Sequence, residues 1–260
     1  MSKPLKGKKL LITREEKQAQ PLVELVQHAG AEPFLAPLLQ FQPIYSKNNE
    51  QALKKIQEQV DWLFFTSANT VYFFEAYRKQ LGLTFSQKIA AVGVKTSHAL
   101  MEYGYTVHFQ PSIYSGAVMV PEFINKFGKE QKIALIGGES ARDEIPDLLQ
   151  KNHVSFQQVA IYRTMKNDAG RKKLRYALKQ EMDACLFTSP STVKTFIEFA
   201  DAYYLEKTKK ETLAVAIGLT TATELKKQGF QHVIYPQKYT IEAMVEQLVA
   251  YLQNERTKKE

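Results

Sequence analysis

The chain has 260 residues and a formal net charge of +8, and its hydrophobic content of 44% is ordinary for a globular protein of one or two domains. The single cysteine, Cys185, excludes a disulfide framework and a multi-cysteine metal site, and its apolar neighbours favour a buried structural role over a nucleophilic one. No apolar stretch approaches the roughly 20 residues that span a bilayer, and the run at 10–12 is too short for a signal peptide, so we expect a cytoplasmic protein that makes no membrane contact.

Short apolar runs alternate along the chain with helical patterns. Strands are predicted over 9–13, 62–66, 89–93, 107–109, 133–137, 158–162, 184–188, 213–218 and 233–235. Helices are predicted over 19–29, 49–59, 70–80, 96–103, 115–127, 143–151, 171–179, 192–200, 221–228 and 241–252. Several strands are continuously apolar, which is typical of strands buried on both faces of a parallel sheet. The pattern therefore predicts an α/β fold with doubly wound parallel sheets.

The sequence contains an internal repeat. Residues 61–74 (DWLFFTSANTVYFF) reappear as 183–196 (DACLFTSPSTVKTF), with seven of 14 positions identical at an offset of 122. Residues 90–105 match 215–230 at an offset of 125, and 10–27 match 134–151 more weakly at 124. A period of this length is the size of a domain, so the repeat predicts two similar lobes rather than a solenoid. Clefts between lobes are favoured ligand sites, and we expect one here.

Two equivalent segments, 35–43 and 159–165, are predicted to cross between the lobes as extended chain. Neither is rich in glycine or serine. The residues alone leave two arrangements open: each repeat folds as its own lobe, or the first strand and helix of each repeat are exchanged into the other lobe.

Each lobe repeats a buried strand, a turn of small or hydroxyl-bearing residues, and a helix. Ligands of open α/β sheets bind beyond the carboxyl ends of the strands, where the N–H groups of helix N-termini attract carboxylate or phosphate. Serine and threonine are also the preferred helix N-caps, so a purely structural role is an alternative for each turn. The candidate residues in these turns are Ser67, Thr96, Gly137, Gly138, Thr188, Ser189, Thr220 and Thr221.

The common cofactor and catalytic motifs are missing from the sequence. There is no GxGxxG after a strand, no GxxxxGK[ST], no HExxH and no GxSxG, and the five histidines are dispersed. No pair of carboxylates stands out as an acid and base. The sequence therefore predicts no metal and no nucleotide or covalent cofactor. The lysines and arginines are scattered, without a basic helix interleaved with aromatic residues, so nucleic acid is not the expected partner.

A set of ordered segments resembles the uroporphyrinogen-III synthase family over nearly the full chain. They are LLITR at 10–14, DWLFFTSANTV at 61–71, AAVGVKTSHAL at 90–100, LIGGESARDEIPDLL at 135–149, VAIYRT at 159–164, LFTSPSTV at 186–193, AIGLTTATEL at 216–225 and YTIEAMVEQL at 239–248. The resemblance implies two flavodoxin-like lobes joined by a two-stranded linker at about 36–43 and 159–165. It places 1–37 with 164–260 in lobe one and 40–161 in lobe two, which is the exchanged arrangement.

The resemblance also implies a reaction and its participants. The substrate would be hydroxymethylbilane, a linear tetrapyrrole with many carboxylates, which loses its terminal hydroxyl and is closed into a macrocycle with inversion of the last pyrrole ring. No cofactor is implied. Conformational control and help for the leaving group would account for most of the catalysis. We expect a monomer, with the upstream hydroxymethylbilane synthase as a candidate protein partner.

Tyr162, in VAIYRT, matches a tyrosine that has been proposed, for this family, to donate a hydrogen bond or proton to the departing hydroxide. A phenol can fill this role although it is a weak acid. The alternative for Tyr162 is an aromatic residue that packs between lobes. Thr96, Ser189, Thr220 and Thr221 match family positions near the substrate carboxylates, and Ser67 is the repeat equivalent of Ser189. Two arginines, each with a structural role as the alternative, could pair with carboxylates: Arg14 and Arg142.

Three rival functions remain at this point. A two-lobed module that binds an anionic ligand without catalysis explains the duplication and the charge but not the family segments. A phosphosugar isomerase or transferase would need a Glu, His or Lys base at a strand end, and none is clearly placed. A regulatory protein with a degenerate synthase-like fold is disfavoured because the sequence shows no additional DNA-binding domain.

Overall fold

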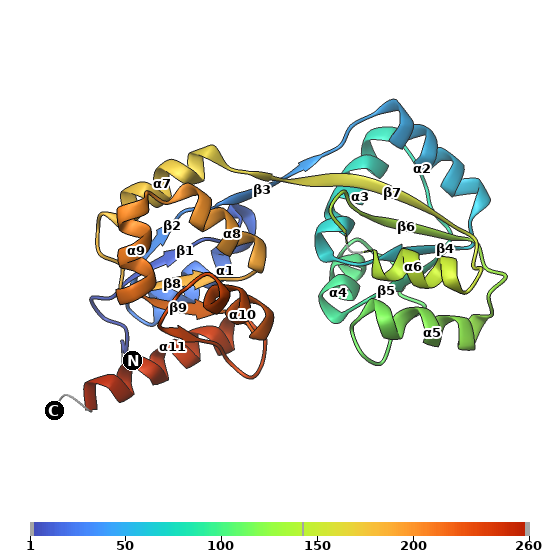
Figure 1. Ribbon diagram of the computed structural model, residues 1–260. Coiled ribbons are helices and arrows are strands. Elements are labelled where there is room, and N and C mark those ends of the chain that lie inside the picture. Colours follow the sequence, from blue (N-terminus) through green and yellow to red (C-terminus); the bar gives the residue numbers. More distant parts are fainter. Residues whose placement is uncertain (1–2, 142, 258–260) are drawn as a thin grey trace. The chain divides into compact units, whose positions relative to one another are not determined.

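The computed structural model describes residues 3–141 and 143–257, and the chain divides into two compact units (Figure 1). Unit 1 comprises Met1–Gln40 and Met165–Glu260, and unit 2 comprises Phe41–Thr164. The lobe boundaries that the sequence predicts, 1–37 with 164–260 and 40–161, stay a prediction. Within the described ranges no helix is long and apolar enough to cross a membrane.

Unit 1 is built on a five-stranded parallel sheet in the order β10-β9-β8-β1-β2. Its strands are β1 (Lys9–Ile12), β2 (Glu32–Leu35), β8 (Ala184–Phe187), β9 (Leu213–Ala216) and β10 (Val233–Ile234). Its helices are α1 (Glu16–His28), α7 (Asp168–Leu178), α8 (Pro190–Phe199), α9 (Ala202–Glu211), α10 (Leu219–Lys227) and α11 (Ile241–Thr257).

Unit 2 is built on a second sheet in the order β3-β7-β6-β4-β5, in which β7–β6, β6–β4 and β4–β5 are parallel pairs. Its strands are β3 (Leu39–Pro43), β4 (Trp62–Phe65), β5 (Lys88–Ala91), β6 (Ile133–Gly138) and β7 (Phe156–Lys166). Its helices are α2 (Lys47–Gln59), α3 (Ala68–Leu81), α4 (Val94–Glu102), α5 (Gly116–Phe127) and α6 (Glu144–Lys151). The chain passes between the units along β3 and β7.

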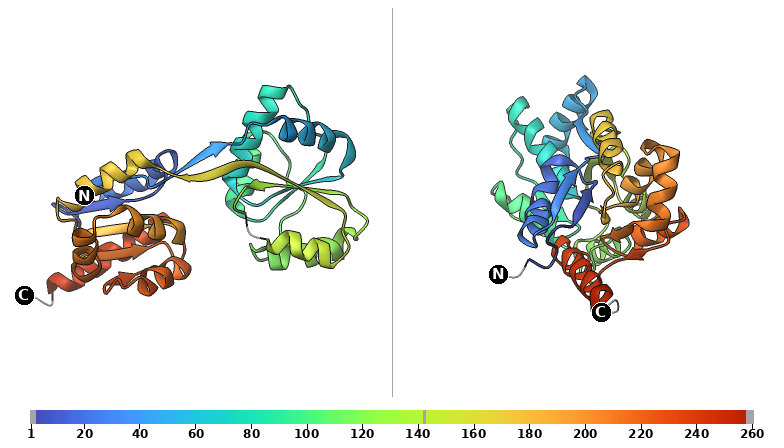
Figure 2. Two further views of the ribbon diagram at one scale, coloured as in Figure 1. Left: turned by 45° about the horizontal axis from the view of Figure 1, so that its top comes forward. Right: turned by 90° about the vertical axis from the view of Figure 1, so that its left-hand side faces the viewer.

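Both faces of each sheet are buried by helices, which explains the continuously apolar strands. In unit 1, Leu10 and Ile12 pack with α1 and α11, whereas Leu11 and Cys185 pack on the other face with α7, α8 and α10. In unit 2, α2, α3 and α4 cover one face, and α5 and α6 lie side by side on the other (Figure 2). Each large apolar side chain so buried contributes about 1.5–3 kcal/mol. The predicted α/β class with two parallel-sheet lobes is confirmed.

The strand pairing shows whether each repeat folds as its own lobe or exchanges its first strand and helix with the other repeat. β1, from the first repeat, pairs with β8 of the second repeat, with Leu10 beside Ala184. Conversely, β6 of the second repeat pairs with β4 of the first, with Ala134 beside Leu63. The first strand and helix of each repeat therefore complete the sheet of the other repeat.

The structure departs from the predicted elements in several places, and β3, for example, was predicted only as extended chain that crosses between the lobes. Residues 107–109 form only a one-residue bridge, Phe109 with Ala90, because this segment lies at a sheet edge and pairs with β5 on one side alone. Helix α9 was not predicted, since Leu205 and Thr208 are its only buried residues and give no clear apolar period. Strand β2 also escaped prediction because it is a short edge strand that contains Pro33.

Candidate active site

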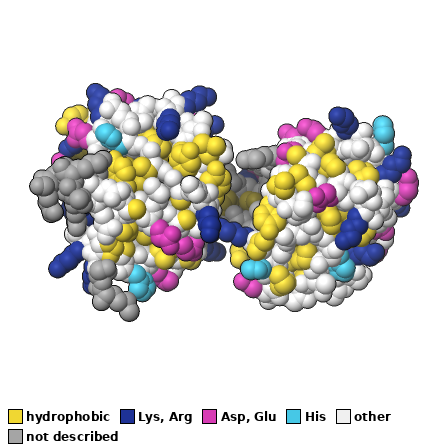
Figure 3. Space-filling model, turned by 90° about the horizontal axis from the view of Figure 1, so that it is seen from below, with side chains coloured by type: hydrophobic (Ala, Val, Ile, Leu, Met, Phe, Trp, Pro, Cys, Tyr) yellow, Lys and Arg dark blue, Asp and Glu magenta, His cyan; other side chains and the backbone are white. Residues whose placement is uncertain are grey.

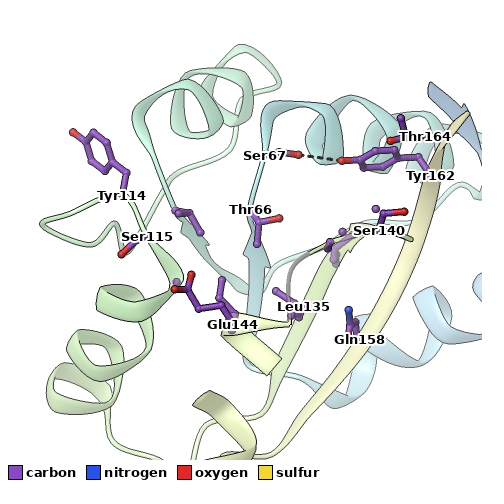
Figure 4. Close-up of a pocket in the computed structure, with 17 residues that line it drawn as sticks. Thr66, Ser67, Tyr114, Ser115, Leu135, Ser140, Glu144, Gln158, Tyr162 and Thr164 are labelled. Atoms are coloured by element: carbon purple, nitrogen blue, oxygen red, sulfur yellow. Dashed lines mark hydrogen bonds between the residues drawn. The ribbon is translucent and has the colours of Figure 1, made fainter. Parts of the chain in front are cut away.

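A cavity of about 440 Å³ lies in unit 2, at the carboxyl ends of β4, β5 and β6 (Figure 4). This is the edge of a parallel sheet at which ligands bind in open α/β folds, and the volume is within the range of small-molecule sites. The lining residues are Thr66, Ser67, Val92, Tyr114, Ser115, Gly116, Leu135, Ile136, Gly137, Gly138, Ser140, Ala141, Glu144, Ile145, Gln158, Tyr162 and Thr164. Of the predicted site residues, the cavity brings together Ser67, Gly137, Gly138 and Tyr162.

Tyr162 is held against the neighbouring strand. It pairs with Gly138 across β6 and β7, where the register shifts between Gly137 and Gly138, and its carbonyl accepts a hydrogen bond from the Glu139 N–H at 2.8 Å. A Cβ on Gly138 would lie 2.7 Å from Cζ and 3.0 Å from Oη of the tyrosine. The glycine therefore leaves room for the outer end of the ring, and its lack of a side chain is a requirement of packing.

Two phenylalanines and a serine fix the orientation of the tyrosine ring. Phe73 stacks on Tyr162 with ring centroids 4.9 Å apart and an interplanar angle of 15°, and Phe41 meets it edge-on at 5.8 Å. The hydroxyl lies 3.4 Å from Oγ of Ser67 (Figure 4). With the ring held on these sides, the phenol oxygen is directed to a defined point of the cavity.

Ser67 has a second role as the N-cap of α3. Its Oγ accepts a hydrogen bond from the Thr70 N–H at 3.2 Å and lies 2.9 Å from Oγ1 of Thr70. The structural role that serine plays at helix starts is therefore present here, together with the contact to Tyr162. The two roles are not exclusive, because one hydroxyl oxygen has two lone pairs and one proton.

Glu144 is the one charged side chain among the described residues that line the cavity. Its carboxylate approaches α5: a Cβ on Gly116 would lie 2.6 Å from Oε2, so this helix begins with a residue that leaves space for the acid. Arg142, a predicted carboxylate-binding residue, lies outside the described residues.

Thr96 does not contribute a group to this cavity. Its side chain is buried within the first turn of α4, and its N–H donates to the carbonyl of Gly93 at 3.0 Å. The N-cap of α4 is Gly93, without a side-chain cap, so Thr96 does not fill the N-cap role that was the structural alternative. Its predicted role in substrate binding stays a prediction.

The other predicted site residues lie in unit 1, at the carboxyl ends of its strands. Ser189 caps α8 by accepting from the Thr192 N–H at 3.2 Å, as Ser67 does for α3. Thr188 is partly buried, Thr220 is exposed and Thr221 is buried.

Arg14 follows β1 and is partly buried. One of its terminal nitrogens donates to Oε1 of Gln18 at 3.2 Å, whereas its Nε has no partner among the described residues. Burial lowers the pKa of Arg14, an effect that neighbouring Glu15 opposes. A partly desolvated guanidinium with an unused N–H is suited to a carboxylate.

Cys185 lies in the middle of the unit 1 sheet and is fully buried. Burial raises the pKa of its thiol to about 12, so the thiol is protonated at neutral pH. The structural role that its apolar neighbours predict is the one observed.

Sequence reasoning missed several polar residues that line the cavity, Tyr114, Ser115, Glu144 and Gln158. A signal for the first two was present: Tyr114-Ser115 and Tyr239-Thr240 are separated by the same offset of 125 as Gly93 and Gly218, and each pair precedes a helix. The match continues into these helices with Met119 and Met244.

The exchanged α/β repeats, with glycines, hydroxyl groups and a tyrosine at the strand ends, define a class of small-molecule-binding α/β proteins. Comparison with protein families narrows this class, because the family model described as uroporphyrinogen-III synthase HemD matches residues 20–246. The chain belongs to the uroporphyrinogen-III synthase family, whose members are enzymes of tetrapyrrole biosynthesis, and the predicted family is confirmed.

Two relatives illustrate the range of the family. The porphyrin biosynthesis protein HemD of Ruminiclostridium josui is 32% identical over 257 residues, or 96% of this chain, and the chain spans 49% of the length of that relative. A putative uroporphyrinogen-III synthase of Methanocaldococcus jannaschii is 29% identical over 244 residues, which cover 92% of this chain and 96% of the relative.

Solved structures share the fold. A mutant uroporphyrinogen III synthase from the extremely thermophilic bacterium Thermus thermophilus superposes with a TM-score of 0.68 at 19% identity, covering 95% of this chain and 100% of that one. A uroporphyrinogen-III synthetase from Helicobacter pylori gives 0.65 at 16% identity, covering 94% and 99%. At these identities the likeness establishes the fold alone.

Proposed function

We propose that this chain catalyses the cyclisation of hydroxymethylbilane to uroporphyrinogen III, with inversion of the terminal pyrrole ring and loss of water. The observation that carries the proposal is the family match over residues 20–246, which includes Tyr162 in the cavity of unit 2. The family acts on a small-molecule tetrapyrrole, and its reaction needs positioned donors more than a strong base.

In the proposed first step, the bond between the terminal carbon of the bilane and its hydroxyl oxygen breaks. The electron pair leaves with the oxygen, which accepts a hydrogen bond or a proton from Tyr162, while the pyrrole nitrogen supplies electrons to form a cationic azafulvene. The substituted α-carbon of the last pyrrole then bonds to this carbon and gives a spiro intermediate. The bond from that α-carbon to its original methylene bridge breaks, which leaves an azafulvene on the neighbouring pyrrole. The freed bridge carbon bonds to the other α-carbon of the last pyrrole, which loses its proton, so that the ring is inverted and neutrality is restored. The Phe73 and Phe41 contacts support this role, because a donor whose ring is already fixed loses little entropy when the leaving group arrives.

The proposed carboxylate-binding residues are Ser67, Gly137 and Gly138 in unit 2, and Arg14, Thr188, Ser189, Thr220 and Thr221 in unit 1. The unused Nε of Arg14 supports its inclusion. The predicted cleft, the cytoplasmic location, the monomeric state and the contact with hydroxymethylbilane synthase stay predictions.

The deciding experiment incubates the purified protein with freshly generated hydroxymethylbilane, oxidises the products and separates the uroporphyrin isomers. Isomer III should predominate over isomer I, which forms spontaneously from the same substrate. Isomer I alone, at the uncatalysed rate, would reject the synthase and favour a two-lobed module that binds anions without catalysis.

Tyr162→Phe tests the residue that the proposal assigns to the leaving group. The variant keeps the ring contacts and removes the donor, so kcat should fall about 10-fold, with KM nearly unchanged and isomer III still formed. A kcat equal to that of the wild type would mean that Tyr162 only packs.

A further inference from the structure

Each unit contains a tyrosine that lies against a glycine at the start of a helix. Tyr114 lies against Gly93, the N-cap of α4, and Tyr239 lies against Gly218, the N-cap of α10. A Cβ on Gly218 would be 2.7 Å from Cγ of Tyr239, and a Cβ on Gly93 would be 3.5 Å from Cγ of Tyr114. The backbone is extended at Gly93 and at Gly218, a conformation that any residue can adopt. Glycine is therefore needed at position 218 because the tyrosine ring occupies the space of a Cβ, and not because of its φ angle.

Both tyrosines are exposed although their rings are large. Tyr114 is 58% exposed and Tyr239 55%, and the residue after each glycine is also an exposed aliphatic one, Val94 at 38% and Leu219 at 50%. A single exposed apolar residue needs no explanation. Here the same aromatic and aliphatic pair is exposed at the same place in both repeats, although the repeats have diverged at most other positions.

Within the described part of the chain, neither tyrosine is held by an aromatic partner or through its hydroxyl. Among the described residues neither tyrosine makes a ring–ring contact or a hydrogen bond through its hydroxyl. More than half of each tyrosine is therefore exposed, and a ligand that covered the ring would remove apolar area from water.

The position of Tyr114 connects this feature to the candidate active site. The tyrosine lines the cavity together with Ser115, at the end away from Tyr162 (Figure 4). In unit 1, Gly218 follows β9, and Tyr239 lies between β10 and α11.

We propose that Tyr114 with Val94, and Tyr239 with Leu219, form two pyrrole-binding surfaces, each of which receives the face of a pyrrole ring of a tetrapyrrole bound at its own unit. This inference rests on the proposed function and specifies which residues bind the rings of its substrate. A pyrrole is a flat, electron-rich ring whose apolar face must be covered while its carboxylates are bound elsewhere. Tyrosine offers a flat apolar area and loses little entropy on binding because it has two rotatable side-chain bonds.

The test measures KM and kcat for isomer III formation in Tyr114→Ala, Tyr239→Ala and the matching Phe variants. Each Ala variant should raise KM about 3- to 10-fold, the range expected for loss of one aromatic contact, and leave kcat within about twofold because Tyr162 is untouched. The Phe variants should behave as the wild type, because the ring face is retained.

Exposed tyrosines away from the cavity provide matched controls. Tyr45→Ala in unit 2 and Tyr203→Ala in unit 1 remove rings that are 52% and 73% exposed, and both should leave KM unchanged. Wild-type KM in both Ala variants at Tyr114 and Tyr239 would overturn the inference, and so would Phe variants as impaired as the Ala variants, since the hydroxyl would then be the group that binds.

The outcomes also separate this inference from the proposed function. If the wild type forms isomer III and the Ala variants keep its KM, the pyrrole-binding surfaces are rejected and the synthase stands. If the wild type yields isomer I alone, the proposed function fails and the inference fails with it.

Discussion

Tyr162 shows how one side chain is positioned by three residues from two neighbouring elements. Gly138 on β6 admits the ring, Phe73 on α3 stacks on it, and Ser67 at the start of α3 lies beside its hydroxyl. Each neighbour restricts a different direction of movement. Gly138 has no side chain that could rotate out of the way. The position of the Tyr162 ring therefore depends most on this glycine.

We expect Gly138→Ala to disturb Tyr162 directly. The new Cβ would lie within 3.0 Å of Cζ, Cε2 and Oη, so the ring must shift, at a cost of about 1–2 kcal/mol in unfolding free energy. The same shift should lower kcat about 10-fold, as loss of the hydroxyl does. Thermal unfolding and isomer III kinetics measure the two effects.

A neighbouring glycine and a double variant serve as the controls for this prediction. A Cβ on Gly137 would meet Cβ of Ala141 at 3.6 Å, an ordinary contact, so Gly137→Ala should keep the stability of the wild type. In a Tyr162→Ala background, Gly138→Ala should cause no further loss of kcat. An equal loss in both backgrounds would show that the glycine acts through another group.

At the scale of the element, two helices begin with the same serine N-cap but have different neighbours. Ser67 caps α3 and Ser189 caps α8, both through an N–H three residues later at 3.2 Å. Only Ser67 has a tyrosine hydroxyl within reach among the described residues. The pair therefore shows the same serine cap with and without a contact to a tyrosine hydroxyl.

Replacing either serine by alanine should cost about 1 kcal/mol of unfolding free energy, because a first-turn N–H loses its acceptor. For units of this size that loss lowers the melting temperature by about 3 °C. We further expect Ser67→Ala alone to lower kcat, about threefold, since its hydroxyl helps to orient Tyr162. An unchanged melting temperature would contradict the capping role.

At the scale of the whole molecule, charge is the property that bears most on function. The formal net charge is +8, and on the face seen in Figure 3 the basic side chains lie dispersed among acidic and apolar ones. The described lining of the unit 2 cavity carries no basic side chain, only Glu144. Attraction of a polycarboxylate would therefore come from the overall field of the protein rather than from one basic pocket.

This distribution predicts a salt-dependent rate of substrate capture. Raising the salt concentration from about 20 to about 200 mM should lower kcat/KM about 3- to 10-fold, because exposed charges are screened over a shorter distance. The value of kcat at saturating substrate should hardly change. Sodium and potassium chloride should act alike, and a kcat/KM independent of either salt would reject the steering role of the charge.

Across the whole molecule, burial explains why the core strands could be predicted from the sequence and other elements could not. Strands β4, β6, β8 and β9 are buried on both faces, so their sequences are apolar runs that can be recognised locally. Helix α9 and strand β2 lie where one side is exposed, and there the apolar pattern is weak. The bridge at Phe109 depends on an edge partner, which no local pattern specifies.

The residues of the candidate site also fall into a group that the sequence predicted and a group that it did not. Ser67, Gly137, Gly138 and Tyr162 were predicted because they follow apolar strands or match family segments. Glu144 and Gln158 were missed because an acid at a helix start and a glutamine in a strand are common outside active sites. Tyr114 was missed because it lies in a turn, where the repeat match to Tyr239 is limited to a few residues, and the contact of each ring with its glycine is visible only in the structure.

The sequence by itself determined the α/β class, the duplication and the family, because apolar runs, turn residues and repeated segments are written locally along the chain. Only the tertiary structure decided which strands pair, so that β1 lies beside β8 and β6 beside β4. It also decided that the ring of Tyr162 crosses Gly138 and that two exposed tyrosines lie on equivalent glycines. These contacts join residues far apart in the chain, and their geometry follows from the packing of whole elements rather than from any local pattern.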